Sequence, residues 1–446
     1  MKKKFFSRKR ESQNYMTLQK SFLHLPVIAA VVIITILTGS NAFSYDSTVV
    51  DKYGSLRVVG NKIVDKNGNP VVLRGMSLYW SQWKPGFYNY KCIKWLRDDW
   101  KCSVVRASMA VESGGYLTNP TVEKAKIKTV IDACIDLGIY VIVDWHDDHA
   151  QNYISQAITF FQEIANQYSG IPNVIYEIYN EPYGGFAWGS VIKPYADSVV
   201  KCIRAMEPDN LIVVGTPNWS QYVDDAANNP LSYNNIAYSL HFYAASHKQW
   251  LRDRATKALN KGVALFVTEF GTCESSGSGV LDSTETYTWL NFLDANKISW
   301  CNWSVADLSE TSAALIPGAD PNGSWSTSTI KPSGILVKRK LLEAYNSSIT
   351  GITPSSDLPL NFKLQQNYPN PFNPTTVITF SIPEITDVRL SVCDILGQEV
   401  AVLVHGVKQA GIYQVRFDGS SLASGVYFST LQTAGKTITK KLVLMK

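Results

Sequence analysis

Eight short apolar runs, separated by amphipathic stretches, are the feature that most constrains the fold of this 446-residue chain. The runs are rich in Val and Ile and do not alternate strictly between apolar and polar residues, which is typical of strands buried on both faces. A hairpin-like stretch, Leu56–Val59 followed by Lys66–Asn69, is expected to lead into the first of them. The expected strands are Val71–Met76, Ser103–Met109, Tyr140–Trp145, Val174–Tyr179, Leu211–Gly215, Ile236–Leu240, Ala264–Thr268 and Ile298–Trp303.

Amphipathic helical patterns fill most of the intervals. The clearest is Thr121–Leu137, where Val130 and Cys134 share the apolar face and Gly138 ends the pattern. The other expected helices are Tyr153–Tyr168, Val191–Met206, Lys248–Leu259 and Thr284–Ala295. Strands alternating with helices over residues 53–345 predict an α/β fold, a (β/α)8 TIM barrel. The alternative is a doubly wound open sheet.

The first 42 residues are typical of an export signal. Lys2-Lys3-Lys4 opens a basic region, Leu25–Gly39 forms an apolar core, and Ser40-Asn41-Ala42 offers small residues for cleavage. The alternative is a membrane anchor, but this apolar core is shorter than the roughly twenty residues that a spanning helix needs. We therefore expect residues 1–42 to be a signal peptide that is removed.

Charge and cysteine content argue against two classes of function. Lys and Arg occupy six of the first ten positions, and the rest of the chain is nearly balanced in charge, so no nucleic-acid partner is expected. The seven Cys form no CxxC motif and no cluster with His, so no metal site is expected. Cys134 and Cys202 lie within helical patterns and are expected to be buried thiols.

The composition changes after Tyr345. Residues 346–360 are rich in Ser, Thr, Pro, Ile and Leu and are expected to be a linker. Short alternating runs follow, with Gly residues between them, and predict a small all-β sandwich over residues 361–446. Its expected strands are Val377–Ile382, Val388–Val392, Val400–Val404, Tyr413–Phe417, Val426–Leu431 and Thr437–Leu444. No pair of carboxylates stands out in this part, so a second enzyme is not expected.

Two glutamates mark the ends of expected barrel strands. Glu181 and Glu269 each follow an apolar run, just before Pro182 or Gly271 breaks the pattern. The C-terminal ends of parallel barrel strands meet at one mouth, where catalytic residues lie. Two carboxylates across a cleft are what hydrolysis of a glycosidic bond requires. We therefore expect Glu181 to act as general acid/base and Glu269 as nucleophile.

Other polar and aromatic residues occupy equivalent positions. Arg106, His146, His241 and Trp303 each fall at or just beyond the end of a different run. Arg106 would supply the positive charge that keeps Glu269 ionised. Taken alone, each residue has a structural alternative: an ion pair for Arg106, a satisfied buried side chain for either His, and core packing for Trp303.

Residues 53–345 resemble glycoside hydrolase family 5, the clan A β-glucanases, and most of all its bacterial endoglucanases. The motifs that carry the resemblance span the whole barrel. They are Arg74-Gly75-Met76-Ser77, Val105-Arg106-Ala107, Asp144-Trp145-His146, Tyr179-Asn180-Glu181-Pro182, His241-Phe242-Tyr243, Thr268-Glu269-Phe270-Gly271 and Trp303-Ser304-Val305-Ala306-Asp307.

The resemblance assigns roles to further residues. It implies that Asn180 hydrogen-bonds the sugar 2-hydroxyl, that Tyr243 sits beside Glu269, and that His146 and His241 line the cleft. It also implies that aromatic rings stack on sugar rings, since pyranose rings present apolar C–H faces to indoles. The implied stacking residues are Trp83, Trp219 and Trp303.

Three positions depart from the family pattern. Tyr79 stands where relatives often have His, Ala110 stands where a Tyr is expected, and Leu308 stands where a Lys is common. An aromatic residue at position 79 would stack rather than hydrogen-bond. These departures affect the expected substrate preference, not the expected reaction.

Residues 361–446 resemble the type A sorting domain of the type nine secretion system. The resemblance rests on four segments: Leu364–Pro374, Asp394-Ile395-Leu396-Gly397, Ser424-Gly425-Val426-Tyr427 and Thr439–Lys446. It implies secretion, with the protein outside the cell or attached to its surface, and the secretion machinery as a partner. The alternatives are a fibronectin-like spacer and a carbohydrate-binding module; against the latter, this part contains no Trp.

The sequence as a whole predicts a retaining endo-β-1,4-glucanase that hydrolyses cellulose or related β-glucans. No metal or cofactor is expected for this chemistry, and a monomer is the default expectation. Two alternatives remain open: a β-mannanase or broad β-glucanase on the same scaffold, and a non-catalytic glycan-binding protein.

Overall fold

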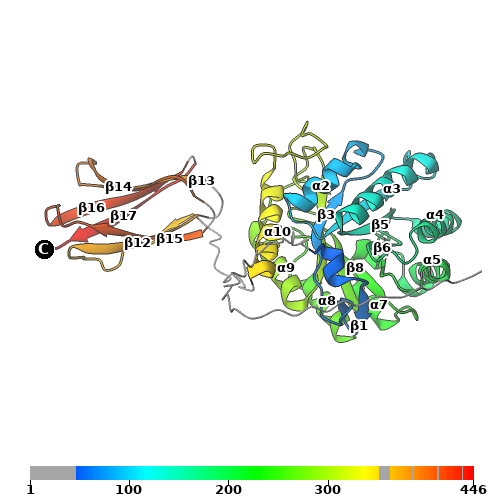
Figure 1. The fold of residues 1–446 in the computed structure, drawn as a ribbon. Coiled ribbons are helices and arrows are strands. Elements are labelled where there is room, and N and C mark those ends of the chain that lie inside the picture. Colours follow the sequence, from blue (N-terminus) through cyan, green and yellow to red (C-terminus); the bar gives the residue numbers. More distant parts are fainter. Residues whose placement is uncertain (1–46, 351–361, 383–385, 409–410, 434) are drawn as a thin grey trace, which may run out of the picture. The chain divides into compact units, whose positions relative to one another are not determined.

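The fold is described by a computed structural model that covers residues 47–350, 362–382, 386–408, 411–433 and 435–446 (Figure 1). The expected signal peptide, residues 1–42, and residues 351–360 of the expected linker lie outside these described residues. Among the described residues, no helix combines the length and the apolar character that crossing a bilayer needs.

Eight parallel strands form a closed barrel. β3, Arg74–Leu78, pairs with β10, Ser299–Val305, and this pairing closes the cylinder. The strands between them, in order around the barrel, are β4 (Val104–Ala110), β5 (Tyr140–His146), β6 (Val174–Glu177), β7 (Ile212–Val214), β8 (Ile236–Tyr243) and β9 (Ala264–Gly271). Each strand overlaps its predicted run, so the TIM barrel is confirmed and the open sheet is excluded.

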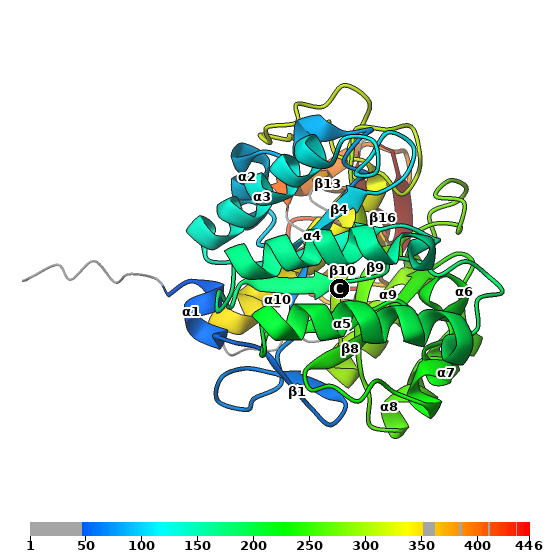
Figure 2. The ribbon, with the colours of Figure 1, turned by 90° about the vertical axis from the view of Figure 1, so that its right-hand side faces the viewer.

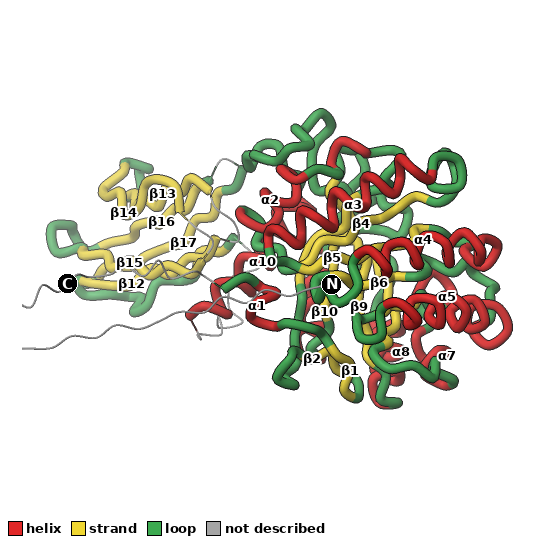
Figure 3. The backbone as a smooth tube through the Cα atoms, turned by 45° about the vertical axis from the view of Figure 1, so that its right-hand side comes forward, coloured by secondary structure: helices red, strands yellow, loops and turns green. Residues whose placement is uncertain are grey.

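Helices form the outer layer around these strands (Figures 2 and 3). The helices are α2 (Tyr90–Asp98), α3 (Pro120–Leu137), α4 (Ile154–Gln167), α5 (Lys193–Met206), α6 (Pro217–Ser220), α7 (Val223–Asn228), α8 (Gln249–Asn260), α9 (Ser283–Asn296) and α10 (Pro332–Thr350). Short 3-10 turns span Pro85–Phe87 and Ala150–Tyr153, and a π-helical turn spans Trp188–Ile192. Their buried apolar faces and the outer faces of the strands make one continuous core.

The inside of the barrel is apolar at its N-terminal end and polar at its C-terminal end. Val104, Ile142 and Phe266 belong to an interior apolar cluster that the N-terminal hairpin covers, with Leu56 and Ile63 packed into it. The hairpin consists of β1, Arg57–Val59, and β2, Lys62–Val64. The next inward-facing positions carry buried polar side chains: Arg106, Asp144, Glu177, Ser239 and Thr268. Arg106, Asp144 and Glu177 therefore place buried charged groups at the mouth of the barrel.

β9 contains one extra residue close to the mouth. Ser239 pairs with Phe266 but His241 pairs with Glu269, and on the other side Trp300 pairs with Val267 but Asn302 pairs with Phe270. Two residues on each neighbour thus match three on β9, which is the pattern of a β-bulge. Strict alternation from Phe266 would turn Glu269 away from the interior. The bulge is what lets both Thr268 and Glu269 face the mouth.

The barrel part extends past its predicted bounds at both ends. A short helix, α1 (Val49–Tyr53), begins before residue 53; Thr48 caps it by accepting a hydrogen bond from the Asp51 amide at 3.1 Å. At the other end α10 continues to Thr350. Residues 346–350, expected to belong to the linker, are therefore helical.

All seven Cys are free thiols. Cys134 is buried, as expected, but Cys202 on α5 is only partly buried and its thiol lies 3.7 Å from the Ile158 carbonyl oxygen.

The C-terminal part forms two antiparallel sheets around a core of its own. One sheet has the order β11-β12-β15 and the other β14-β13-β16-β17. The strands are β11 (Lys363–Leu364), β12 (Thr375–Ile382), β13 (Thr386–Cys393), β14 (Glu399–Lys408), β15 (Gly411–Asp418), β16 (Gly425–Gln432) and β17 (Thr437–Leu444). Buried Phe380, Leu390 and Leu442 belong to this core. The predicted small all-β domain is confirmed.

Candidate active site

Arg106 on β4 is fully buried and its guanidinium joins four side chains at the mouth of the barrel. Nε donates to Glu177 Oε2 at 2.7 Å and Nη1 donates to Glu269 Oε2 at 2.9 Å. Nη2 donates to Asn180 Oδ1 at 2.7 Å and lies 2.9 Å from Asp144 Oδ2. Burial alone would lower the pKa of Arg106, but the three carboxylates outweigh burial and raise that pKa well above its ordinary value.

The acids around Arg106 differ in their environments. Burial raises the pKa of Asp144 well above its usual range, and Arg106 opposes that shift only in part. Burial also acts to raise the pKa of Glu177, but Arg106 and His241 outweigh it and lower that pKa below its usual range. Glu177 is therefore ionised at neutral pH, whereas burial disfavours the charged form of Asp144.

A chain of hydrogen bonds leads from Glu177 to Glu181. Thr268 Oγ1 donates to Glu177 Oε1 at 2.5 Å and lies 2.8 Å from His241 Nε2. The other ring nitrogen of His241, Nδ1, lies 2.7 Å from Glu181 Oε1. Burial would lower the pKa of His241, but the carboxylates of Glu177 and Glu181 raise it to about 9. Both ring nitrogens are therefore protonated at neutral pH, and both donate.

Glu269 on β9 lies between Arg106 and Tyr243. The Tyr243 hydroxyl donates to Glu269 Oε1 at 2.8 Å, while Arg106 contacts the other carboxylate oxygen. Burial and the Glu269 charge raise the pKa of Tyr243 well above its ordinary value, so the phenol keeps the proton that it donates. One oxygen of Glu269, one oxygen of Glu181 and one nitrogen of His241 all lie within 4.8 Å of one another.

These same three residues form the one cluster, in the part of the chain that the structure describes, that is compact enough to hold a metal ion. Each already has partners: His241 binds Glu181 and Thr268, and Glu269 binds Arg106 and Tyr243. The adjacent positive charges of Arg106 and His241 would repel a cation. That the chemistry needs no metal stays a prediction.

His146 at the end of β5 lies behind an aromatic ring of the cleft. Its ring stacks on Trp303 with centroids 5.2 Å apart, and its Nδ1 lies 2.6 Å from Asp144 Oδ2. Burial and Arg106 lower the pKa of His146 to about 3, so it is neutral. Because only 2% of His146 is exposed, its clearest role in the structure is to support Trp303, and its contact with a sugar stays a prediction.

A row of aromatic residues comes from the loop after β3 and from β10 itself. Tyr79 lies 5.1 Å from Trp303 and 6.4 Å from Trp83 by ring centroids. Trp303 is 5% exposed and Trp83 is 53% exposed. The Tyr79 hydroxyl donates to Glu310 Oε1 at 3.2 Å. Tyr79 thus combines ring packing with a hydrogen bond to Glu310, and its stacking on a sugar stays a prediction.

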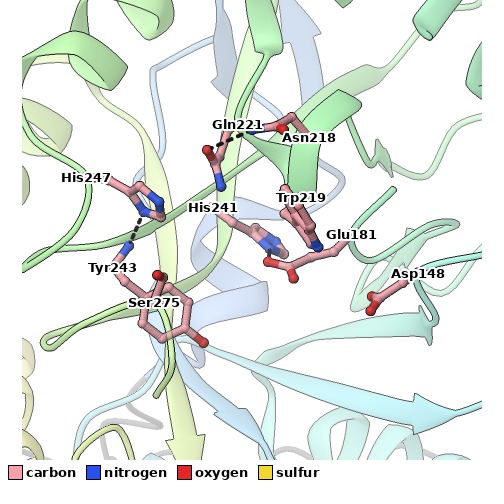
Figure 4. Close-up of a pocket in the computed structure, with 9 residues that line it drawn as sticks. All are labelled: Asp148, Glu181, Asn218, Trp219, Gln221, His241, Tyr243, His247 and Ser275. Carbon is pink, nitrogen blue, oxygen red and sulfur yellow. Dashed lines mark hydrogen bonds and ion pairs between the residues drawn. The ribbon is translucent and has the colours of Figure 1, made fainter. Parts of the chain in front are cut away.

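An open cavity of about 460 Å3 lies beside Glu181 (Figure 4). Its lining residues come from the loops after β5 to β9 and are mostly polar. They are Asp148, Glu181, Asn218, Trp219, Gln221, His241, Tyr243, His247 and Ser275. The cavity contains one large aromatic platform, Trp219, which is 37% exposed. Such a polar pocket with an indole face suits a sugar rather than an apolar ligand.

Trp219 is held in place by an unusual turn. Asn218, Trp219 and Ser220 all have left-handed backbone, with φ of 57°, 55° and 56°, a conformation that costs L-residues about 1–2 kcal/mol each. Two hydrogen bonds fix it: the Trp219 amide donates to the Pro182 carbonyl at 2.9 Å, and Ser220 Oγ donates to the Asn180 carbonyl at 2.8 Å. The turn therefore ties the Trp219 ring to the segment that carries Glu181.

The structure gathers Arg106, Asn180, Glu181, His241, Tyr243 and Glu269 in one cluster and places Trp219 beside them in the cavity wall. Sequence reasoning gave no role to Asp144, Asp148, Glu177, Gln221, His247 or Thr268. For Glu177 a signal was present, because an acid inside an apolar strand needs a buried cation. The loop residues carry no such signal.

Comparison with known proteins adds family information to this geometry. Residues 64–309 match Cellulase (glycosyl hydrolase family 5), and residues 366–445 match the Secretion system C-terminal sorting domain. Domains of the second kind direct secretion to the cell surface or the exterior, so the predicted localisation is confirmed.

Individual relatives agree with the family match. An endoglucanase of Clostridium saccharobutylicum is 45% identical over 326 residues, which cover 72% of each chain. Endoglucanase Z of Dickeya dadantii is 49% identical over 266 residues, covering 59% of this chain and 62% of that protein.

Among solved structures, one from Cytophaga hutchinsonii is 52% identical, with a TM-score of 0.67, over 68% of this chain and all of that chain. A complex of Thermobifida fusca endoglucanase Cel5A with cellotetraose is 37% identical, with a TM-score of 0.64, over 66% of this chain and 99% of that chain.

Proposed function

Since the chain belongs to glycosyl hydrolase family 5, the cellulase family, we propose that it is a retaining endo-β-1,4-glucanase that cleaves internal bonds of cellulose or related β-glucans. The observation that carries this proposal is the pair Glu181 and Glu269: one carboxylate oxygen of each lies within 4.8 Å of the other, and Glu181 lines an open cavity. Retaining glycosidases have a separation of about 5–5.5 Å, whereas inverting enzymes leave room for a water at about 6.5–9.5 Å.

In the first step Glu269 attacks the anomeric carbon, and the bond to the leaving oxygen breaks as Glu181 protonates that oxygen. Arg106 and Tyr243 hold the two oxygens of Glu269, which fixes its orientation for attack. The proton that the leaving oxygen requires is held in the pair of Glu181 and His241. A covalent glycosyl-enzyme results, and the leaving sugar departs.

In the second step water replaces the leaving sugar. Glu181 takes a proton from the water, whose oxygen then attacks the anomeric carbon and releases Glu269. Asn180 would bind the sugar 2-hydroxyl through its Nδ2 amide hydrogens, because its Oδ1 already accepts from Arg106. The product then has the same anomeric configuration as the substrate.

The aromatic row and the cavity would bind the substrate on opposite sides of the bond that is cleaved. Tyr79, Trp83 and Trp303 would hold sugars on the side that becomes bound to the enzyme, and Trp219 would hold the sugar that leaves. A cleft with platforms on both sides of the acids suits cleavage within a chain. The C-terminal domain would deliver the enzyme to the secretion machinery, and a monomer is sufficient for this chemistry.

The test is a reducing-sugar assay of wild type, Glu181→Gln and Glu269→Gln on soluble cellulose derivatives. Each substitution is expected to lower turnover by several orders of magnitude, because it removes the proton donor or the nucleophile while keeping the shape of the side chain. Glu163→Gln is the matched control, since Glu163 is a surface residue of α4 that pairs with Lys124 and Lys128. It should act like wild type.

Two further readouts separate the alternatives. Products from cellulose, mannan, xyloglucan and mixed-linkage glucan identify the preferred backbone, and NMR of the first-formed anomer checks retention. A wild-type protein that binds glucan but releases no sugar would establish the non-catalytic alternative. An inverted first product would contradict the role of Glu269 as nucleophile.

A further inference from the structure

The cavity beside Glu181 lies on the side of the departing sugar. If Glu181 protonates the leaving oxygen, the sugar attached to that oxygen must rest against Glu181. The cavity extends from Glu181 toward Trp219 and Gln221 in the loop after β7 and His247 in the loop after β8. Tyr79 and Trp83 come from the opposite part of the barrel, after β3. The polar groups of the cavity are therefore positioned to select the leaving sugar.

Asp148 lies in the loop after β5. Hydrogen bonds hold its backbone, whereas its carboxyl group has few hydrogen-bond partners. Its carbonyl oxygen accepts from the Tyr183 amide and from the Tyr179 hydroxyl, each at 3.1 Å. Its carboxyl group has a single long contact, in which Asn180 Nδ2 donates to Oδ1 at 3.4 Å. Within the described residues no partner is recorded for Oδ2, and the side chain lines the cavity near Glu181 (Figure 4).

The neighbouring Asp147 provides a contrast. It is buried, and its Oδ1 accepts from the His149 amide at 2.5 Å, so it serves the conformation of the loop. The two adjacent acids thus differ in role: Asp147 stabilises the loop, whereas Asp148 faces the space that a sugar would fill.

We propose that Asp148 is a specificity-determining residue that hydrogen-bonds a hydroxyl group of the first sugar on the leaving side of the cleft. The inference rests on the proposed glucanase function, because it requires a sugar to leave from Glu181. It adds a directional polar contact to the indole face of Trp219, which by itself would not discriminate one hydroxyl arrangement from another.

The electrostatic surroundings decide the form in which Asp148 binds. Burial raises the pKa of Asp148 to about 7, the carboxylates of Glu181, Asp147 and Glu269 act in the same direction, and the Asn180 amide opposes them. Below pH 7 Asp148 is thus a neutral acid that both donates and accepts a hydrogen bond. Above that pH it is a carboxylate that only accepts, and it repels the nearby catalytic acids.

His247 supplies a complementary donor in the same cavity. Its Nδ1 accepts from the Tyr243 amide at 2.8 Å, and burial lowers its pKa to about 4, so the ring is neutral. The ring proton must then be on Nε2. A sugar in the cavity would meet an imidazole N–H from His247 and a carboxyl group from Asp148, which suits a ring with several hydroxyls.

The experiment compares two substrates that differ only on the leaving side. Cellotetraose places a sugar on the leaving side, whereas 4-nitrophenyl β-cellobioside places a nitrophenyl group there, which has no hydroxyl for Asp148 to bind. Asp148→Ala is expected to lower kcat/KM on cellotetraose about fivefold to tenfold, mainly through KM, the usual size for one lost hydrogen bond. On the nitrophenyl substrate the loss should stay below about twofold.

Asp148→Asn gives a second, independent measurement that keeps the side-chain shape. It should retain most of the cellotetraose activity near pH 6. For wild type we expect KM to rise between about pH 6 and 8, because Asp148 then loses the proton that it donates to the sugar. Asp148→Asn should abolish that rise. Asp136→Asn, which neutralises an exposed carboxylate on α3, is the matched control and should leave both the KM values and their pH dependence unchanged.

The outcomes separate this inference from the proposed function. A wild-type protein that hydrolyses neither substrate overturns the proposed function. Equal losses on both substrates, or no loss on cellotetraose, overturn the role of Asp148 while leaving the proposed function intact. If Asp148→Ala does not fold, Asp148→Asn decides: a wild-type pH dependence of KM in that variant overturns the inference.

Discussion

At the scale of single residues, the site contains more acidic groups than positive charges to pair with them. Arg106 faces Asp144, Glu177 and Glu269, and the three acids cannot all be ionised at low cost in a buried site. Burial disfavours the charged form of Asp144, and the protonated His241 beside Glu177 adds a second positive charge. Glu269 is thereby left with two hydrogen-bond donors and no competing acid in contact.

His241 should make the stability of the barrel depend on pH. Its pKa is raised from 6.5 to about 9, so its stabilising contribution is complete below about pH 6.5 and is lost as pH rises through about 9. The quantity to compare is the free energy of unfolding of wild type minus that of His241→Gln. We expect this difference to be largest near pH 6 and to shrink by up to about 3 kcal/mol by pH 10.

Urea unfolding followed by Trp fluorescence measures this difference in the barrel alone, because the 12 Trp all lie between residues 80 and 325. The control is His247→Gln. Burial lowers the pKa of His247 to about 4, so its side chain is neutral in both folded and unfolded chains above about pH 7. Its effect should be constant there. A constant effect for His241→Gln as well would contradict the proposed charge state of His241.

At the scale of elements, two local irregularities aim the functional side chains. The bulge in β9 turns Glu269 toward the mouth, and the left-handed turn at residues 218–220 presents Trp219 to the cavity. Both disturb regular structure at the C-terminal end of the barrel, where loops can absorb the disturbance without exposing the core.

Gly184 is expected to control the position of Trp219. A Cβ atom at residue 184 would lie 2.6 Å from the edge of the Trp219 ring, so Gly184→Ala must displace that ring. We expect KM for cello-oligosaccharides to rise about fivefold, which corresponds to about 1 kcal/mol of lost stacking, with a smaller change in kcat.

The matched control is Gly189→Ala in the π-helical turn, where a Cβ would meet no atom within 4 Å. Steady-state kinetics on cellotetraose compare the two variants. If both leave KM unchanged, Trp219 does not bind the leaving sugar in the position that the structure gives it.

At the scale of the whole molecule, catalysis and delivery are assigned to separate hydrophobic cores. The barrel core contains residues between 56 and 341, and the C-terminal core contains residues between 364 and 444. A part of a chain that buries its own core is expected to fold by itself.

Removing residues 361–446 is therefore expected to leave kcat/KM on soluble cellulose derivatives within about twofold of wild type. The same truncation should prevent export in a bacterium that has the matching secretion system, because the sorting domain is absent. Activity in cell and medium fractions measures both effects. Loss of activity in the purified barrel, or normal export without the domain, would contradict this division of roles.

The barrel, the all-β domain and the two acidic positions at strand ends could be predicted from the amino-acid sequence. These rest on local signals: apolar runs of strand length, helical periodicity, and a Pro or Gly within two residues after each acid, Pro182 and Gly271. It did not locate the end of α10, because the Ser and Asn after residue 345 are also compatible with the last turn of a helix.

The groups that surround those acids could not be predicted, because they come from strands that are far apart in the chain. Nothing local to Glu177 states that it shares Arg106 with Asp144, and nothing local to Glu269 reveals the extra residue in β9, because strand register depends on both neighbouring strands. Asp148 acquires its raised pKa from burial and from the carboxylates of Glu181, Asp147 and Glu269, and it lines the cavity only because the barrel brings these loops together. The periodicity of apolar residues predicts whether a segment forms a helix or a strand. The chemistry of its side chains depends on their distances from segments that are far apart in the chain.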